Sequence, residues 1–291
     1  GAGHLIGRER ELTVLLGALD AVRQGASRQV ALQGPAGVGK SRLAQVFLEH
    51  CTAAGCTVLQ GAGDGVASGR PLGPFVQMLR ACLSMPQQQP ASEGWEPAAA
   101  ALARLGIDAT EDQAAWVQLL DAGDGHAATA MVPAVLAATL LRLIRALAAS
   151  APVVMFIDDW HWADDASHHL LSLMCSSPQP RLLLMLAARG FDAQDIGLLE
   201  AFEQVELPPL DDDETVRCVG RLVPNANPLQ AAEVCRYAGG NLLFIEELRH
   251  RLARGGNIAA SRGANEDAAW LDLLIESRVA RLPDTLAALV R

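Results

Sequence analysis

The sequence contains a single lysine, Lys40, and all its other Lys/Arg positive charges are arginines. Aromatic residues are also scarce, at 4% of the chain, whereas alanine and leucine are abundant, which favours helices. Acidic side chains outnumber basic ones and give a net charge of −10. An acidic surface argues against direct nucleic-acid binding by this segment, because nucleic acids are bound by basic surfaces.

Cysteine pairs with metal-binding or redox spacing are absent as well. The six cysteines form no C-x-x-C motif, so we interpret them as reduced, mostly buried thiols of a cytoplasmic protein rather than as a metal site. No signal-peptide pattern is present. The longest apolar stretch, residues 131–149, is interrupted by Pro133, Arg142 and Arg145, and we therefore expect no transmembrane span and no membrane partner.

Apolar runs alternate with segments of helical periodicity. Runs typical of buried strands occupy residues 28–34, 152–159 and 181–189. Residues 56–61 are a second strand candidate, and residues 204–210 predict a short last strand that is ended by prolines. Helices are predicted over residues 9–23, 41–54, 74–83, 165–175 and 196–202. Strands that are apolar throughout and alternate with helices indicate an α/β fold, in which helices cover both faces of a parallel sheet.

The predicted α/β domain spans residues 1–210 and contains a long insertion. The insertion lies between the second strand and the third, over residues about 62–150. Within it we expect a polar, proline-rich loop over residues 85–97. Residues 98–150 are alanine-rich and predict two or three helices with a break near Gly123.

The character of the chain changes after the last predicted strand. The acids of "DDDE", residues 211–214, provide an N-cap and a negatively charged first turn for a helix. From there to the end we find helical patterns and no strand. Residues 211–291 are therefore predicted to form an all-helical lid domain, which we expect to be truncated at its C-terminal end as part of a longer protein.

The single lysine lies in a glycine-rich motif, Gly34-x-x-x-x-Gly39-Lys40-Ser41, between a predicted strand and a predicted helix. Glycines let several backbone N–H groups point at one phosphate, and the helix N-terminus adds partial positive charge. A lysine is a compact charge that reaches between phosphates where the planar arginine fork does not fit. The hydroxyl of Ser41 is a ligand for Mg²⁺. The alternative is a glycine-rich turn without a ligand.

Two further strand ends carry groups that suit nucleotide chemistry. The run "VVMFIDD" places Asp158 where it can reach a Mg²⁺ ion and Asp159 where it can orient an attacking water. Two acids that cap the next helix are the alternative, and Asp165 can be explained as such an N-cap. Arg189 ends the next apolar run and can face the γ-phosphate, because parallel strands end at one edge of a sheet. A solvated strand-end arginine is the alternative.

Four segments resemble the ATPase core of signal-transduction ATPases with numerous domains, the STAND class: "LIGREREL", "GPAGVGKSRL", "FIDDWHWADDASHHLL" and "GGNLLFIEEL". Within this class they are most similar to the AAA-like module of MalT-like LuxR regulators and of related multidomain bacterial signalling proteins. The resemblance covers residues of about 4 to 250. One position departs from it: where the family's lid reads Gly-Asn-Pro, this chain has Leu242 after Gly240 and Asn241.

The resemblance implies a P-loop NTPase core that binds ATP or ADP with Mg²⁺. The residues that it implies in nucleotide binding are Ile6, Gly7 and Arg8 at the adenine; Gly34, Pro35, Ala36, Gly37, Val38, Gly39, Lys40, Ser41 and Arg42 at the phosphates; and Gly240 and Asn241 in the lid. Its catalytic residues are Asp159, Lys40 and Arg189, and its metal ligands are Ser41 and Asp158. The partners that it implies are fused sensor and output domains beyond this chain, and self-association on ATP binding is left open.

The first functional hypothesis is therefore a slowly hydrolysing ATP switch in a larger signal-transduction or transcription-regulatory protein. An adenine nucleotide is expected, because an N-K-x-D guanine motif needs a second lysine. A ring-forming AAA+ motor or loader is the alternative from another class. Such rings use a neighbour's arginine placed before the last strand, whereas residues 190–216 contain no Arg or Lys. A nucleotide-binding scaffold without turnover is the third hypothesis.

Overall fold

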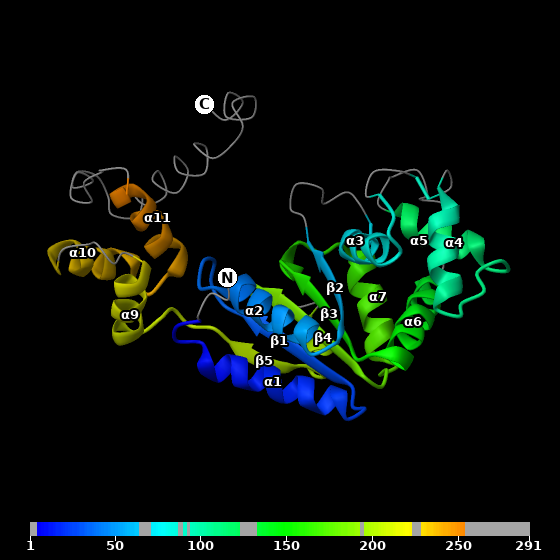
Figure 1. The fold of residues 1–291 in the computed structure, drawn as a ribbon, viewed down its shortest axis with the longest axis horizontal. Helices are drawn as coiled ribbons and strands as arrows, with labels where there is room; N and C mark the ends of the chain where they lie inside the picture. Colours follow the sequence, from blue (N-terminus) through cyan, green and yellow to red (C-terminus); the bar gives the residue numbers. More distant parts are fainter. Residues whose placement is uncertain are drawn as a thin grey trace, which may run out of the picture. The chain divides into compact units, whose positions relative to one another are not determined.

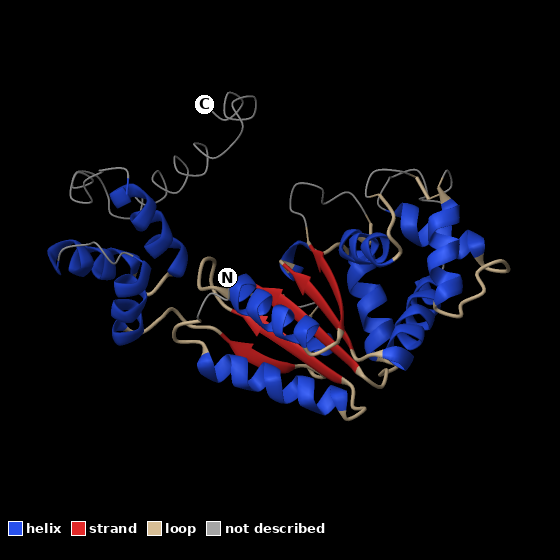
Figure 2. Ribbon diagram, viewed as in Figure 1, coloured by secondary structure: helices blue, strands red, loops and turns tan. Residues whose placement is uncertain are grey.

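The computed structural model describes residues 5–63, 71–86, 90–91, 94–122, 133–192, 195–222 and 228–253. The chain divides into two compact units, and each is described by itself. The first comprises residues 1–36 and 40–207, and the second comprises residues 37–39 and 208–291. Figure 1 labels the elements along the chain, and Figure 2 distinguishes helices from strands.

The sheet of the first unit has five parallel strands in the order β2-β3-β4-β1-β5. Their bounds are β1 Arg28–Gln33, β2 Thr57–Ala62, β3 Val153–Asp158, β4 Leu182–Ala188 and β5 Glu203–Glu206. Every residue of β4 is buried, and β3 is buried up to Ile157. The parallel sheet that the continuous apolar runs predict is therefore confirmed.

Helices cover both faces of this sheet (Figure 1). The helices α1 (Glu9–Arg23) and α2 (Lys40–Ala53) pack on each other. Helix α1 contacts β1 and β4, and helix α2 contacts β2 and β3. On the other face, α6 (Pro133–Ser150) packs on β3 and on α7 (Asp165–Cys175). The α/β arrangement around a parallel sheet agrees with the predicted fold class.

The insertion between β2 and β3 is helical. It contains α3 (Gly73–Cys82), α4 (Trp95–Arg104), α5 (Gln113–Asp121) and α6. The guanidinium of Arg80, 1% exposed, connects α3 to α5, since it donates to Leu120 O at 3.0 Å and to Asp121 Oδ1 at 3.0 Å. The predicted break near Gly123 lies outside the described residues.

Helix α6 is long and apolar enough to cross a membrane by length and composition alone. Half of it is buried inside the structure, where it packs on α5, α7 and β3. Core helices of soluble proteins pass the same test of length and composition, so one such helix is weak evidence of a membrane span.

The predicted boundaries of two helices differ from the structure by more than one residue. Helix α4 begins at Trp95, inside the loop predicted over residues 85–97. Its proline, Pro97, lies in the first helical turn. Proline lacks a backbone N–H, and this costs no hydrogen bond there, because the N–H groups of the first turn have no acceptor within the helix. The helix predicted over residues 196–202 is shorter: α8 ends at Leu199, and β5 starts at Glu203.

Over its described residues the second unit has helices and loops but no strand. Its helices α9 (Asp212–Leu222), α10 (Pro228–Ala238) and α11 (Leu242–Ala253) pack on one another. The predicted N-cap is present as a reciprocal pair: Glu214 N–H donates to Asp211 Oδ1 at 2.7 Å, and Asp211 N–H donates to Glu214 Oε2 at 3.0 Å. The predicted helical region after residue 253 lies outside the described part of the chain.

Candidate functional site

The glycine motif forms the turn from β1 into α2. Strand β1 ends at Gln33, and α2 begins at Lys40. Gly37 and Gly39 have positive φ angles of 81° and 98°, which other residues rarely adopt. The loop starts at the sheet edge, where Gly34 N–H donates to Ala188 O of β4 at 3.3 Å. The strand–loop–helix context that the motif requires is therefore present.

Lys40 is 7% exposed and turns back over the loop. Its Nζ atom donates to Gly34 O at 2.7 Å and to Pro35 O at 2.9 Å. Burial lowers the pKa of Lys40, the carboxylates of Asp158 and Asp159 oppose this shift, and the Arg189 charge adds to it. The only lysine of the chain therefore lies in the electrostatic field of both acids and of Arg189.

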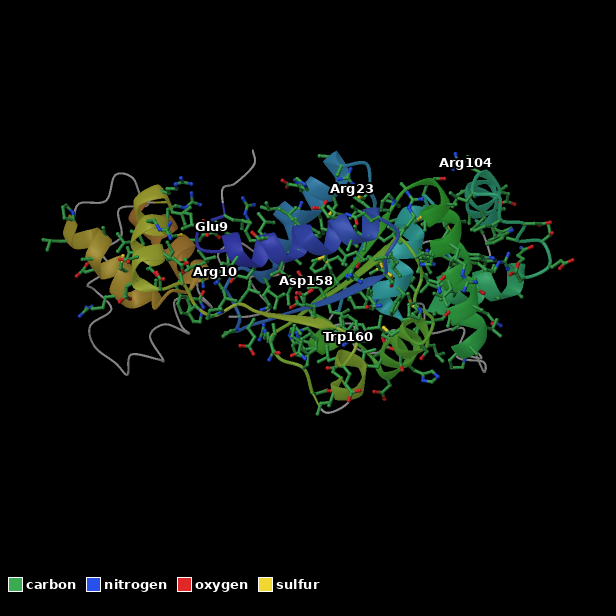
Figure 3. The ribbon with its side chains drawn as sticks, turned by 90° about the horizontal axis from the view of Figure 1, so that it is seen from below. Glu9, Arg10, Arg23, Arg104, Asp158 and Trp160 are labelled. Atoms are coloured by element: carbon green, nitrogen blue, oxygen red, sulfur yellow. The ribbon has the colours of Figure 1, made fainter. Side chains whose placement is uncertain are left out.

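The two acids lie at the carboxyl end of β3. Asp158 ends the strand, and its Oδ1 accepts a hydrogen bond from Asp159 N–H at 2.9 Å. Asp159 precedes the short 3₁₀ helix η2 (Trp160–Trp162) and makes no capping hydrogen bond with its side chain. The interpretation of the pair as helix caps is therefore not supported. Figure 3 labels Asp158 and Trp160, which belong to the same strand end.

Arg189 is exposed and follows β4. In the strand order, β4 lies between β1, which leads into the glycine loop, and β3, which leads into the acids. The Arg189 charge lowers the pKa of Lys40 and that of His161. The sheet thus brings Lys40, the two acids and Arg189 to one carboxyl edge.

Asp164, rather than Asp165, caps α7, so the assignment of Asp165 as N-cap is wrong. Asp164 Oδ1 accepts from Ser167 N–H at 3.0 Å. Its Oδ2 accepts from Ser167 Oγ at 2.7 Å and from Leu72 N–H, in front of α3, at 3.1 Å. Asp165 is exposed in the first turn of the helix. The helix begins one residue earlier than an N-cap at Asp165 requires.

Two residues that the motifs did not single out lie against Asp159. His161 Nδ1 is 3.9 Å from Asp159 Oδ1, and burial lowers the pKa of His161, an effect that the Asp159 carboxylate opposes. Gly63, after β2, donates its N–H to Asp158 O at 2.9 Å. A Cβ atom on Gly63 would be 2.4 Å from Asp159 O. The signal for His161 was present in "HWAD", whereas nothing local marks Gly63.

Other residues that were predicted to bind nucleotide or metal lie before α1, at the start of α2 and in the second unit. Ile6, Gly7 and Arg8 precede α1, where Arg8 is 2% exposed and its Nη1 is 3.3 Å from Glu11 Oε1. Ser41 and Arg42 are exposed in the first turn of α2.

Gly240 and Asn241 belong to the second unit. Gly240 O accepts from Leu210 N–H at 2.9 Å, and a Cβ atom on Gly240 would be 2.1 Å from Leu210 O. This close approach gives Gly240 a packing role in the helical unit. Asn241 Oδ1 accepts from Leu243 N–H at 3.0 Å at the start of α11.

The donor set at the sheet edge suits Mg²⁺. Ser41 and Asp158 offer one hydroxyl and one carboxylate, and magnesium in phosphate-transfer sites takes one or two carboxylates together with substrate phosphates. No group of three or more His, Cys, Asp or Glu side chains with metal-binding geometry occurs among the residues that the structure describes. The protein's ligands therefore fit a metal ion that arrives with a phosphate group.

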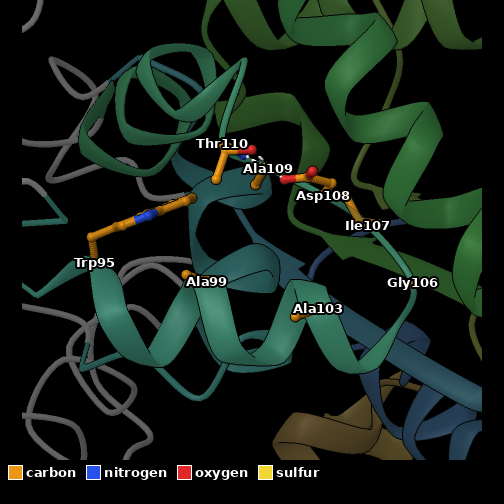
Figure 4. A pocket seen from close by; sticks show the side chains of 8 residues that line it. All are labelled: Trp95, Ala99, Ala103, Gly106, Ile107, Asp108, Ala109 and Thr110. Atoms are coloured by element: carbon orange, nitrogen blue, oxygen red, sulfur yellow. Dashed lines mark hydrogen bonds between the residues drawn. The ribbon is translucent and has the colours of Figure 1, made fainter.

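A cavity of about 440 Å³ lies elsewhere, in the helical insertion (Figure 4). Its wall is formed by Trp95, Ala99 and Ala103 of α4 and by the residues 106–110 that follow this helix. None of the candidate site residues lines it. The carboxyl edge of the sheet and this cavity are therefore separate features.

A glycine loop between β1 and α2, with acids after β3, defines a P-loop nucleoside triphosphatase. Residues 4–186 match the family model of the AAA ATPase domain, and the chain belongs to this family. Nucleotide binding follows from this membership.

Comparison with known proteins finds a relative by sequence and several structures of similar fold. The chain is 28% identical over 302 residues to an uncharacterised protein of Rhizobium meliloti (strain 1021) and covers 28% of that protein's length. The structure is similar to a mutant form of Thermotoga maritima RuvB, with a TM-score of 0.50, 16% identity and coverage of 96% of this chain and 73% of that chain. For Drosophila ORC bound to DNA, the TM-score is 0.53 at 13% identity, with coverage of 97% and 65%. At these identities the likeness to solved structures shows the fold alone.

Proposed function

We propose that this chain is the ATP-binding, slowly hydrolysing switch module of a larger signal-transduction or transcription-regulatory protein. The observation that carries the proposal is the meeting of Lys40 with Asp158, Asp159 and Arg189 at one edge of the parallel sheet. A cation inside a glycine loop binds phosphates, and two acids beside it serve a metal ion and a water molecule.

Each side chain has a separate task in this proposal. Lys40 exchanges its two carbonyl partners, Gly34 O and Pro35 O, for oxygens of the β- and γ-phosphates. Ser41 and Asp158 would hold Mg²⁺, which supplies neutralisation of phosphate charge when it is bound. Arg189 faces the γ-phosphate and adds positive charge there in cis.

Asp159 is the proposed base. Its carboxylate orients a water molecule in line with the γ-phosphate. The water oxygen forms a bond to the γ-phosphorus, and the bond from that phosphorus to the β–γ bridging oxygen breaks, with its electron pair leaving on ADP. One proton of the water passes to the Asp159 carboxylate.

The wider context is a proposal too. The chain spans 28% of the length of its Rhizobium relative, which supports a module within a longer protein. The motif resemblance supports the STAND class, with MalT-like regulators as the nearest group, and an adenine nucleotide. In this setting ATP and ADP states of the module would be read by fused domains.

A DNA-handling ring ATPase is less well supported. The fold neighbours include RuvB and an ORC bound to DNA, but their likeness concerns the fold. The net charge of −10 disfavours a phosphate backbone as partner. Residues 190–216, which lead through the last strand, carry no Arg or Lys to donate to a neighbouring subunit.

Replacing Lys40 tests the proposal. We expect Lys40→Ala to weaken Mg·ATP binding by about tenfold or more, since each hydrogen bond to a charged group contributes roughly 1.5–3 kcal/mol. The matched control is Arg28→Ala, which removes an exposed positive charge at the opposite end of β1. Calorimetry with both variants measures the affinity, and thermal unfolding verifies the fold. Equal affinity in Lys40→Ala and Arg28→Ala would contradict the proposed site.

A further inference from the structure

Asp159 has a left-handed backbone, with φ 49° and ψ 41°, a region that few residues besides glycine, asparagine and aspartate adopt. Such a conformation persists only where surrounding contacts fix it. Two backbone N–H groups contribute: Trp162 N–H donates to Asp159 O at 2.9 Å, and Asp159 N–H donates to Asp158 Oδ1 at 2.9 Å. These bonds fix the peptide groups on both sides of Asp159. The next side chain, that of Trp160, supplies a constraint from outside this turn.

Trp160 is completely buried, and its indole has one specific partner. Nε1 donates to Asp195 Oδ1 at 2.9 Å, and Asp195 is 2% exposed. The His168 ring of α7 lies against the indole, with ring centroids 4.7 Å apart. Rotation of the indole would break this hydrogen bond and leave the Trp160 N–H buried and unpaired, which would lower the stability of the fold. The indole therefore holds the backbone of its own residue, directly after Asp159, in one place.

Asp195 is held in turn by its surroundings. Its Oδ2 accepts from Asp192 N–H at 3.1 Å, and His168 Nδ1 is 3.2 Å from its Oδ1. Burial alone would raise the pKa of Asp195, but the contacts with His168, with Trp160 and with the Asp192 amide outweigh burial and lower it. The contact with Asp195 raises the pKa of His168 against the effect of burial. An ionised, buried carboxylate with these partners is a rigid anchor.

The anchor connects two neighbouring strands. Trp160 follows Asp159 at the end of β3, and Asp195 lies in the segment that follows Arg189 at the end of β4. The Trp160–Asp195 hydrogen bond spans 35 positions of sequence. It thus joins the segment that carries the proposed base to the segment that carries the proposed γ-phosphate arginine.

We propose that Trp160 and Asp195 are positioning residues for ATP hydrolysis: their hydrogen bond fixes the Asp159 backbone so that its carboxylate points at the attacking water. This inference rests on the proposed function, and neither residue needs to touch the nucleotide. Loss of the bond should lower kcat and leave Mg·ATP binding unchanged, because Lys40 and the glycine loop are not altered.

The test is Trp160→Phe, which keeps an aromatic side chain and removes the N–H donor. We expect kcat to fall by about tenfold, the loss corresponding to one hydrogen bond to a charged group, with KM and calorimetric ATP affinity unchanged. The matched control is Trp116→Phe. Trp116 of α5 is also completely buried, and its Nε1 has no hydrogen-bond partner among the described residues. This control should keep the wild-type kcat.

A double-mutant cycle that combines Trp160→Phe with Asp159→Asn tests whether Trp160 affects kcat through Asp159. If Trp160 acts through Asp159, the double variant is no slower than Asp159→Asn alone. Asp195→Asn provides an independent variant of similar size. The amide has one acceptor oxygen where the carboxylate has two, so it cannot accept from both Trp160 Nε1 and the Asp192 N–H. We expect this variant to reproduce the loss of kcat.

The outcomes separate the inference from the proposed function. A wild type that binds ATP without turnover overturns both hydrolysis and positioning. A wild type with turnover, together with unchanged kcat in Trp160→Phe and in Asp195→Asn, overturns the positioning role alone. An equal loss in the Trp116→Phe control, or a double variant slower than Asp159→Asn by the full factor, also overturns it.

Discussion

Gly63 lies where β2 ends, against the backbone of Asp159. A Cβ atom there would be 2.4 Å from Asp159 O, a distance that real side chains do not show, and the atom in the way is backbone. We expect Gly63→Ala to displace the turn after β3, to lower the free energy of unfolding by about 1–3 kcal/mol and to reduce ATP turnover. Urea denaturation and a phosphate-release assay measure the two effects.

The control for this substitution is Gly73→Ala at the start of α3. A Cβ atom on Gly73 meets nothing within 4 Å, so the variant should keep the stability and turnover of the wild type. If Gly63→Ala has the same stability and turnover as Gly73→Ala, the close approach to Asp159 contributes to neither.

Residues with local signals were predictable from the sequence. Lys40 lies in a motif whose spacing, strand and helix are all contiguous, and the structure has that strand–loop–helix order. Asp195 had no such signal, because its partner Trp160 is 35 positions away and on another strand end. Only the folded sheet brings these two side chains together.

At the scale of elements, Asp164 connects α7 to the insertion. Its carboxylate accepts from Ser167 N–H and Ser167 Oγ and also from Leu72 N–H, and Leu72 is 1% exposed. We expect Asp164→Ala to destabilise the first unit by about 2–4 kcal/mol, from a lost N-cap and an unpaired buried N–H. Chemical denaturation measures the change.

Asp165→Ala is the matched control, since Asp165 is the exposed neighbour in the same first turn. Its removal should cost a few tenths to about 1 kcal/mol through the helix dipole. A larger loss in Asp165→Ala than in Asp164→Ala would mean that the cap is assigned to the wrong acid.

Sequence patterns were sufficient to predict individual strands but not their order in the sheet. Continuous apolar runs predicted β3 and β4, because a strand buried on both faces is apolar along its length, whereas β5 is mostly exposed and carries polar residues. The strand order was not contained in those runs. That β4 lies between β1 and β3 depends on non-local pairing, and this order is what puts Arg189 between the loop and the acids.

At the scale of the whole molecule, the composition of one segment bears on how the protein turns over ATP. Residues 190–216 carry no Arg or Lys, so this segment offers no basic side chain for insertion into a neighbour's site. In the proposed function, Arg189 supplies charge in cis. An arginine donated in trans can raise the rate by ~10³–10⁵, and without it turnover should be slow.

We therefore expect the chain to hydrolyse Mg·ATP well below the ~10 s⁻¹ that is typical of enzymes, at a rate per molecule that does not rise with protein concentration. Asp159→Asn should lower this rate and keep ATP bound, because it removes the base and leaves Lys40 in place. Phosphate release measured over a wide range of protein concentration, for wild type and variant, checks both expectations. A rate per molecule that grows in proportion to concentration would instead show a site shared between subunits, and it would favour the ring-forming AAA+ alternative over the switch.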